Sequence, residues 1–392
     1  MLNNENTVIE NREWETEEII ETGLEAFPGI RIGQTENAQA GTGITVLLSE
    51  DPQGMAAGIY IGGGGPAVRE TAILDPVTTA QSIHAAVLGG GSAFGLDAAG
   101  GVMRYLEEKG IGVAVRDIRV PLVTQVDLFD LPVGDPHIRP DREMAYAACR
   151  LAEEGERGNF RCGNYGAGCG ATIGKYAGGE HAMKSGIGSC LLRQGDLMVG
   201  AIIAVNAFGD IYDWKTGKKI AGARADDGRL YDYREMITYL RKMETARMQA
   251  AALNTTIGIV FTNARFRKPE LCKIAAMAHD GFARSIAPVH TSGDGDSIIA
   301  LSVNGRYMGH QKNAKEREKQ PKEMENRAEE TAGQNIKSPD TEVIAGIDTV
   351  GSLAAWAVSE AILRGVRSAA SAFGYPAVSD LNCLPAEGDV PG

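Results

Sequence analysis

The sequence has few aromatic residues and no long apolar run. Aromatic side chains make up 6% of the 392 residues, and no stretch approaches the roughly 20 apolar residues that a membrane-spanning helix needs. Basic residues are outnumbered by acidic ones, 39 to 51, which gives a formal charge of −12. A general nucleic-acid binder normally presents a basic face, so this charge argues against that class of protein. The polar, acidic N-terminal segment resembles neither a signal nor a transit peptide, and we expect a cytoplasmic protein.

Cysteine and histidine are too sparse and scattered to form the common disulfide or metal motifs. The six cysteines include no CxxC pair, and we expect reduced, mostly buried thiols. The six histidines include no HExxH or HxH pair, so we expect no metal site. His84 lies in an apolar segment that we interpret as a helix, and its pattern is typical of a hydrogen-bonded core histidine.

Three glycine-rich segments resemble known motifs, but each lacks an essential residue. The run 62–65 is followed by proline where the helix of a dinucleotide-binding loop should begin, so we interpret it as a turn. The segment GATIGKY (170–176) has Tyr176 where a phosphate-binding loop needs Ser or Thr. The segment around Ser92 lacks the glycine that follows the serine of a nucleophile elbow.

Apolar periodicity predicts helices and strands without regular βαβ alternation, which indicates an α+β or layered α/β protein. The expected helices cover 76–88, 94–109, 141–154, 232–253, 269–284 and 349–373. The expected strands and extended segments lie within 41–62, 111–131, 166–216, 254–264 and 297–303. Residues 310–342 differ from the rest, because 15 of these 33 residues are charged and almost none is large and apolar. We interpret 310–342 as a solvated or disordered surface insertion.

One junction offers an unusual nucleophile. Asn254 and Thr255 lie between a predicted helix and a predicted β-branched strand. A threonine hydroxyl needs a base, and its own α-amine supplies one once the chain is cut in front of it. The reference pKa of an α-amine is about 7.7–8.0, so the amine is partly unprotonated near neutral pH. Taken alone, the Asn-Thr pair is a common one and is better explained as the ordinary start of a strand.

Longer motifs carry a family resemblance over nearly the whole chain. They include GGGSAFGLDAAGGVMRYLEEKGIG (89–112), GNYGAGCGATIGK (163–175), AIIAVNAFGDI (201–211), NTTIGIVFTNA (254–264) and GDGDSIIAL (293–301). On these segments the chain resembles the N-terminal-nucleophile amidohydrolases that include L-aminopeptidase/D-esterases, β-peptidyl aminopeptidases and nylon-oligomer endohydrolases. The resemblance implies a four-layer αββα sandwich of the aminopeptidase/ornithine-acetyltransferase type. It also implies that a single domain over 1–392 cuts itself into chains 1–254 and 255–392.

The resemblance assigns roles to five residues of this sequence. Thr255 would be the nucleophile, and the amide of Asn206 would donate to the oxyanion. Lys175 would lie near the new amine of Thr255, where its positive charge would help keep that amine neutral. Asp294 and Asp296 would share one face of a strand, one orienting the nucleophile and the other holding a substrate ammonium. Without the resemblance, each of these residues has an ordinary structural explanation.

The Asn-Thr junction and the pair of aspartates look like the nylon-oligomer endohydrolase branch. That branch implies hydrolysis of linear amides, such as 6-aminohexanoate oligomers or similar ω-amino-acid amides, through a threonine acyl-enzyme. It implies no cofactor, and the family implies a homotetramer of processed protomers. An aminopeptidase acting on small, D- or β-amino-acid peptides is the first alternative. An acyltransferase and a catalytically idle assembly that binds amines through Asp294 and Asp296 remain the others.

Overall fold

The computed structural model describes residues 17–154, 158–245, 254–303 and 343–381. The predicted insertion 310–342 lies outside these residues, as does the second part of the helix predicted over 232–253. The described part of that helix, α3, runs over Tyr233–Thr245.

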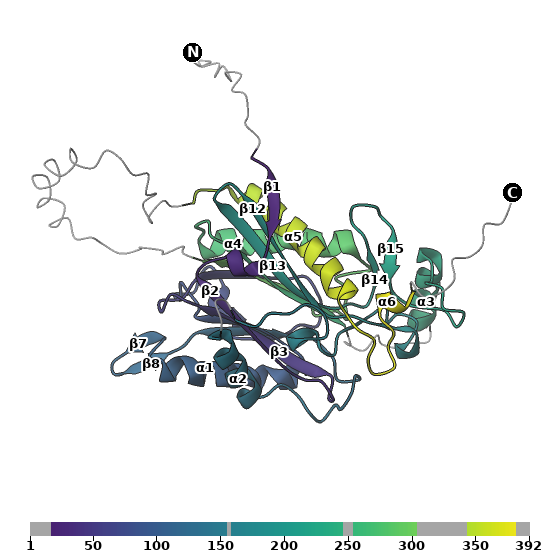
Figure 1. Cartoon of the computed structure of the whole chain (residues 1–392), viewed down its shortest axis with the longest axis horizontal. Helices are drawn as coiled ribbons and strands as arrows, with labels where there is room; N and C mark the ends of the chain where they lie inside the picture. The colour runs from purple at the N-terminus through teal and green to yellow at the C-terminus, as the bar shows by residue number, and fades with distance from the viewer. Residues whose placement is uncertain (1–16, 155–157, 246–253, 304–342, 382–392) are drawn as a thin grey trace, which may run out of the picture.

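Two large β-sheets form the centre of the molecule (Figure 1). The six-stranded sheet contains, in spatial order, β1 (Ile19–Thr22), β12 (Ile187–Gln194), β13 (Leu197–Asn206), β16 (Thr255–Thr262), β18 (Ser297–Ser302) and β4 (Ala56–Ile61). The five-stranded sheet contains β2 (Ile30–Asn37), β3 (Thr42–Ser49), β6 (Ala85–Gly89), β9 (Val123–Asp127) and β5 (Ala67–Arg69). Strands such as β13 and β16 are buried along their whole length, as expected of strands covered on both faces.

Helices cover the outer face of each sheet, which gives four layers. Helices α4 (Lys268–Ser285) and α5 (Ile347–Arg367) pack on the six-stranded sheet. Helices α1 (Ala99–Glu108) and α2 (Arg142–Ala152) pack on the five-stranded sheet. A third apolar cluster, with Ile202, Ile259 and Leu47, fills the space between the two sheets. In Figure 1, α4 and α5 lie at the top, the six-stranded and five-stranded sheets follow, and α1 and α2 lie at the bottom. The predicted αββα arrangement is confirmed.

Smaller elements complete the described chain. The short strands are β7 (Val113–Val115), β8 (Ile118–Val120), β10 (Thr172–Ile173), β11 (Met183–Lys184), β14 (Asp210–Tyr212), β15 (Lys219–Ala221) and β17 (Ile286–Ala287). The short helices are η1 (Leu24–Ala26), η2 (Thr71–Leu74), η3 (Ser92–Ala98), η4 (Gly166–Gly168), η5 (Gly179–His181) and α6 (Val378–Leu381).

One predicted helix is wrong and another is too long. Residues 76–88 form turns that lead into the buried strand β6, so His84 does not lie on a helix. His84 is nevertheless a buried, hydrogen-bonded core histidine, since its Nδ1 accepts from the Leu122 N–H at 3.0 Å. The last predicted helix ends at Arg367 instead of reaching 373, and a turn with Phe373 at a positive φ follows it.

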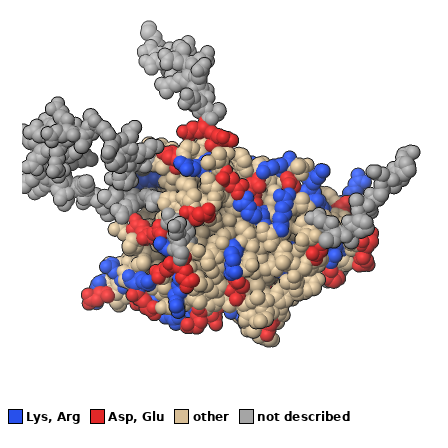
Figure 2. Space-filling view, viewed as in Figure 1, with Lys and Arg blue, Asp and Glu red and all other residues tan. Residues whose placement is uncertain are grey.

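The surface carries both signs of charge. Figure 2 shows lysines and arginines interspersed with aspartates and glutamates over the visible face. The cysteines within the described ranges are all free thiols, as the sequence predicts. No helix in those ranges is both long enough and apolar enough to cross a membrane.

Candidate active site

The Asn254–Thr255 junction lies at the start of a central strand. Thr255 is the first residue of β16, which is flanked by β13 and β18. The exposed fractions are 3% for Asn254 and 4% for Thr255, so both residues are held inside the protein. A nucleophile on a rigid strand keeps a defined position, which covalent catalysis requires.

Two groups contact the carbonyl oxygen of Asn254. The backbone N–H of Gly295 donates to it at 3.0 Å, and the Thr255 hydroxyl also donates to it. Gly295 is required here, because a Cβ at this position would lie 2.8 Å from Thr255 Oγ1. The Asn254 carbonyl, which the Thr255 hydroxyl would attack in self-cleavage, is therefore already polarised by one backbone donor and lies next to that hydroxyl.

Asn206 and Thr255 lie side by side in neighbouring strands. Asn206 is the last residue of β13 and is paired with Thr255 in the antiparallel register. Its Oδ1 accepts from the Thr172 N–H at 3.0 Å and from Lys175 Nζ at 2.7 Å, and its amide Nδ2 donates to Phe129 O at 2.8 Å. These bonds fix the orientation of the amide. Donation by Asn206 to an oxyanion stays a prediction, since Nδ2 here donates to the Phe129 carbonyl.

Lys175 lies against the same asparagine. Its Nζ also donates to the backbone oxygen of Asn206 at 3.0 Å. Burial lowers the pKa of Lys175 to about 7, although Asp294 and Asp130 act in the opposite direction. Lys175 is therefore only partly protonated near neutral pH, so it can supply a positive charge or accept a proton.

The two aspartates lie in the segment that leads into β18. Asp296 Oδ1 accepts from the Thr256 N–H at 2.7 Å, so this carboxylate holds the residue that follows the nucleophile. Asp294 Oδ2 accepts from the Thr291 N–H at 2.7 Å, and its Oδ1 has no donor among the described residues. Burial, followed by the negative charge of Asp296, raises the pKa of Asp294 to about 6. The structure thus brings both acids to the junction, with Gly295 between them facing the Thr255 hydroxyl.

The glycine run 62–65 packs its backbone against this acid segment. The N–H groups of Gly62 and Gly65 donate to the carbonyls of Asp296 and Asp294, at 2.9 and 2.8 Å. A Cβ on Gly63 would lie 2.2 Å from Asp294 O, so only glycine allows this approach. The run is therefore a support for the site, which the sequence alone did not indicate.

Two histidines that sequence reasoning missed complete the site. His290 Nδ1 lies 2.8 Å from Asp296 Oδ2, and the backbone N–H of His290 donates to the same oxygen at 3.1 Å. His290 Nε2 in turn lies 3.1 Å from Nδ1 of His279, on α4. No sequence spacing brings these residues together, because one lies on a helix and the other in the following loop. Among the described residues, no group of three or more His, Cys, Asp or Glu is placed to hold a metal ion.

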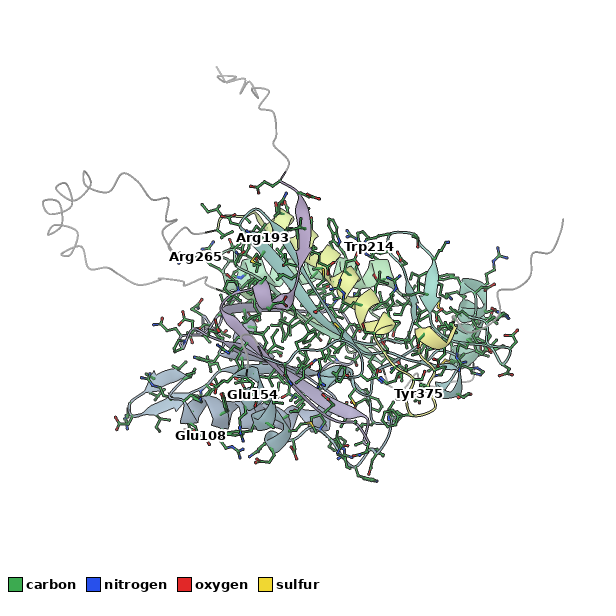
Figure 3. All side chains as sticks on the ribbon, viewed as in Figure 1. Glu108, Glu154, Arg193, Trp214, Arg265 and Tyr375 are labelled. Atoms are coloured by element: carbon green, nitrogen blue, oxygen red, sulfur yellow. The ribbon has the colours of Figure 1, made fainter. Side chains whose placement is uncertain are left out.

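A cavity of about 620 Å³ lies beside the junction. Asn254, Lys175 and Thr172 line one part of it, and Glu180 is the one carboxylate among the described lining residues. The remaining wall is mostly aromatic and aliphatic, and includes Phe129, Val133, Tyr176, Phe208, Tyr239 and Tyr375. Tyr375 is labelled in Figure 3, near the end of the molecule that carries α3 and α6.

Comparisons with known proteins show the family of this chain. The profile of peptidase family S58 matches residues 25–378. An uncharacterized aminopeptidase of Mycobacterium leprae is 39% identical over 266 residues, which cover 67% of this chain and 70% of that protein. A 6-aminohexanoate-oligomer endohydrolase of Kocuria sp. is 28% identical over 71% of this chain and 74% of its own length.

A solved structure confirms the fold. The L-aminopeptidase D-Ala-esterase/amidase of Ochrobactrum anthropi is described as a variant of the Ntn hydrolase fold. It aligns with a TM-score of 0.59 at 16% identity, over 87% of this chain and 84% of its own. The resemblance found in the sequence is therefore confirmed for family and fold. Identity is higher to the mycobacterial aminopeptidase than to the endohydrolase, so identity alone does not favour the endohydrolase branch.

Proposed function

This chain belongs to peptidase family S58 and is a hydrolase of amide bonds, and we propose that it cuts itself between Asn254 and Thr255 to create its own nucleophile. The observation that carries the proposal is the arrangement at the junction. A buried threonine hydroxyl lies beside the carbonyl of the preceding residue, and the Gly295 N–H holds the oxygen of that carbonyl. In this arrangement the attacking and attacked groups are already held together.

Self-cleavage proceeds by acyl transfer from nitrogen to oxygen. Thr255 Oγ forms a bond to the carbonyl carbon of Asn254, and the negative charge that develops on the carbonyl oxygen is stabilised by the Gly295 N–H. The hydroxyl proton passes to a neighbouring base, for which Asp294 and the neutral form of Lys175 are the candidates. The carbon–nitrogen bond then breaks, the Thr255 nitrogen takes up a proton, and water hydrolyses the resulting ester.

The same hydroxyl then acts on substrates. The freed α-amine of Thr255 takes the hydroxyl proton as the hydroxyl attacks a substrate amide, and it returns the proton to the leaving amine. Water hydrolyses the acyl-enzyme and restores the free threonine. Lys175 and Asp294 interact electrostatically with each other, and we propose them as the charged groups near this amine.

The lining of the cavity favours a substrate with an apolar acyl chain. In self-cleavage the acyl group is Asn254 itself, which is one of the residues that line the cavity. A substrate acyl group takes the same place, where it meets mostly aromatic and aliphatic side chains. We propose ω-amino-acid amides, including 6-aminohexanoate oligomers, because a polymethylene chain matches such walls and Glu180 is available for a distal ammonium.

An aminopeptidase on small or β-amino-acid peptides is the second candidate. The observation that favours it is Asp294 Oδ1, which is buried and has no donor among the described residues. A substrate α-ammonium would satisfy that oxygen close to the nucleophile. Assembly as a homotetramer, which the family resemblance implies, and a cytoplasmic location remain proposals.

The proposal is tested by intact mass and then by a substrate panel. Wild type should give two chains of 254 and 138 residues, about 27 and 15 kDa in proportion to length, and Thr255→Ala should remain a single 41.5 kDa chain. The processed protein is then assayed on amides of hexanoate, 6-aminohexanoate, β-alanine and alanine. Preference for 6-aminohexanoate supports the first substrate class, and preference for β-alanine or alanine supports the second. A wild-type chain that stays whole would remove the nucleophile assignment. Equal binding of amines by Thr255→Ala without any turnover by wild type would support an idle amine-binding protein.

A further inference from the structure

The two histidines beside the acid segment form a chain of hydrogen bonds that ends at Asp296. His279 Nε2 lies 3.1 Å from the backbone oxygen of Tyr60, and its Nδ1 lies 3.1 Å from His290 Nε2. His290 Nδ1 lies 2.8 Å from Asp296 Oδ2. His279 and Asp296 are buried, with exposed fractions of 4% and 2%, while the His290 side chain between them is 24% exposed.

The directions of these bonds follow from the acceptor at one end. A carbonyl oxygen only accepts, so His279 donates through Nε2 to Tyr60 O. Burial and the neighbouring His290 lower the pKa of His279 to about 4, so its other nitrogen, Nδ1, is unprotonated and accepts. His290 must then donate through Nε2. The third contact needs one more proton between His290 Nδ1 and Asp296, which makes the whole chain of groups electrically neutral, as burial favours.

The backbone is also held in an unusual conformation at this point. His290 has a φ of +56°, a left-handed conformation that is uncommon for residues other than glycine. Both its N–H and its ring contact the same oxygen of Asp296. Gly62 leaves the room for the two rings, because a Cβ there would lie 2.9 Å from His279 Nδ1 and 3.0 Å from His290 Nδ1. A strained residue that is fixed by several contacts is typical of a functional site.

We propose that His290, oriented by His279, is a positioning residue that fixes Asp296 so that its other oxygen holds the Thr256 N–H. That N–H belongs to the peptide immediately after the nucleophile, so the orientation of Asp296 sets the orientation of Thr255. The proton shared with His290 also offsets the charge of Asp296 beside Asp294. This inference rests on the proposed self-cleavage, because the cut is its readout.

Few charged groups among the described residues surround the pair of Asp296 and His290. Asp294 lies in the same segment, and Lys175 acts on both aspartates electrostatically. His279 is the titratable neighbour from α4, and β4 contributes the Tyr60 carbonyl. When His290 is removed, the charge of Asp296 is no longer offset, so the pKa of Asp294 should rise further above its ordinary value. The acid side of the pH–rate profile should then move to higher pH.

Two substitutions at His290 distinguish the effect of its side chain from the effect of its backbone conformation. His290→Gly accepts the positive φ but removes the donor to Asp296. His290→Asn also tolerates this conformation and keeps an N–H donor near the position of Nδ1. The control is His84→Asn, a conservative change at a buried histidine that directly precedes β6 of the other sheet. The rate of cutting is followed after a short pulse of cell-free synthesis of the full chain.

We expect His290→Gly to be cut at least about 10-fold more slowly than wild type, and His290→Asn to recover to within about 3-fold. In both His290 variants, the acid side of the pH–rate profile of cutting should move to higher pH. The His84→Asn control should be cut at the wild-type rate with the wild-type pH–rate profile. A His290→Gly chain that is cut within 2-fold of the wild-type rate would overturn the proposal, and so would equal rates for the Gly and Asn variants.

A second measurement does not depend on activity. In ¹⁵N-histidine-labelled Thr255→Ala protein, NMR should show His279 protonated at Nε2 alone and His290 protonated at Nε2. An unprotonated His290 Nε2 would overturn the hydrogen-bond directions on which the inference depends. If the wild-type chain is never cut, the proposed function fails, and this spectrum still decides whether the histidine chain exists.

Discussion

Replacement of Gly295 by alanine should stop the protein from cutting itself efficiently while leaving its fold intact. The added Cβ would lie 2.8 Å from Thr255 Oγ1, 3.1 Å from Thr255 Cγ2 and 3.0 Å from Gly65 O. An ordinary contact of this kind is about 3.5 Å or longer, so the overlap with the hydroxyl is more than half an ångström. Neither neighbour can move easily, since Gly65 O belongs to the backbone and Thr255 is fixed at the start of a central strand.

The expected size of the effect follows from this displacement. Misplacing a reacting group by about 1 Å can cost about 100-fold in rate, so a shift of half that size should slow cutting by about 10- to 100-fold. The strain should lower the free energy of unfolding by about 1–3 kcal/mol, which a chain of this size tolerates. Any retreat of the acid segment would also lengthen the bond from the Gly295 N–H to Asn254 O, which acts in the same direction.

The assay is the first-order appearance of the 138-residue fragment after pulsed cell-free synthesis, read by intact mass. The control is Gly346→Ala, because a Cβ there meets nothing within 4 Å and the position has an ordinary φ of −80°. Thr255→Ser in the Gly295→Ala background removes one of the three contacts and keeps a hydroxyl, so it should recover part of the rate. If Gly295→Ala is cut as fast as the control, the packing of Gly295 against the nucleophile does not position it, and this part of the reasoning is refuted.

Three further predictions follow from burial and charge. The rate of self-cleavage should fall as the pH drops through about 6, where Asp294 takes up a proton, and an Asp294→Asn chain should show a low rate without this acid limb. Lys184→Met should lower the free energy of unfolding, measured by urea in the Thr255→Ala background, by about 2–4 kcal/mol, because Lys184 Nζ is fully buried and donates to three backbone carbonyls. Burial lowers the pKa of Lys184 to about 7 in the folded protein, against 10.5 in the unfolded chain. The unfolded chain therefore binds more protons between pH 7 and 10, and the free energy of unfolding rises with pH in this range. This rise should be smaller in Lys184→Met than in the parent protein, and equal rises in the two proteins would show that Lys184 titrates normally. Val133→Trp should fill part of the cavity, slowing hydrolysis of long acyl amides while the self-cut remains, and equal turnover of long and short amides would place the acyl group elsewhere.

The sequence predicted most elements because their patterns are local. Helix α2 begins after Asp141, whose side chain accepts from the Met144 N–H, and such a cap is visible in the sequence. The failure over 76–88 has an equally local cause. β6 (Ala85–Gly89) is buried on both faces and therefore has a continuous apolar run, which has the same appearance as one turn of a buried helix. Burial by two covering layers is a property of the whole fold, and no short window contains it.

In the candidate site, too, features that depend on local motifs were predictable from the sequence, and features that depend on contacts between distant segments were not. The structure places Thr255, Asn206 and the two aspartates near one another, because strand pairing brings their motifs to one end of the six-stranded sheet, while their roles stay predictions. The contacts that determine chemistry were not predictable, since they depend on how a glycine run and two histidines approach from other layers. Asp296 was expected to face the nucleophile, whereas its described contacts are the Thr256 N–H and His290. Two chemically identical carboxylates thus acquire different surroundings, one beside a proton-donating ring and one with a buried oxygen that has no donor in the described site. A difference of this kind is what separates a positioning acid from an acid that can exchange protons or bind an amine, and it arises only from the packing of α4 and β4 around the loop.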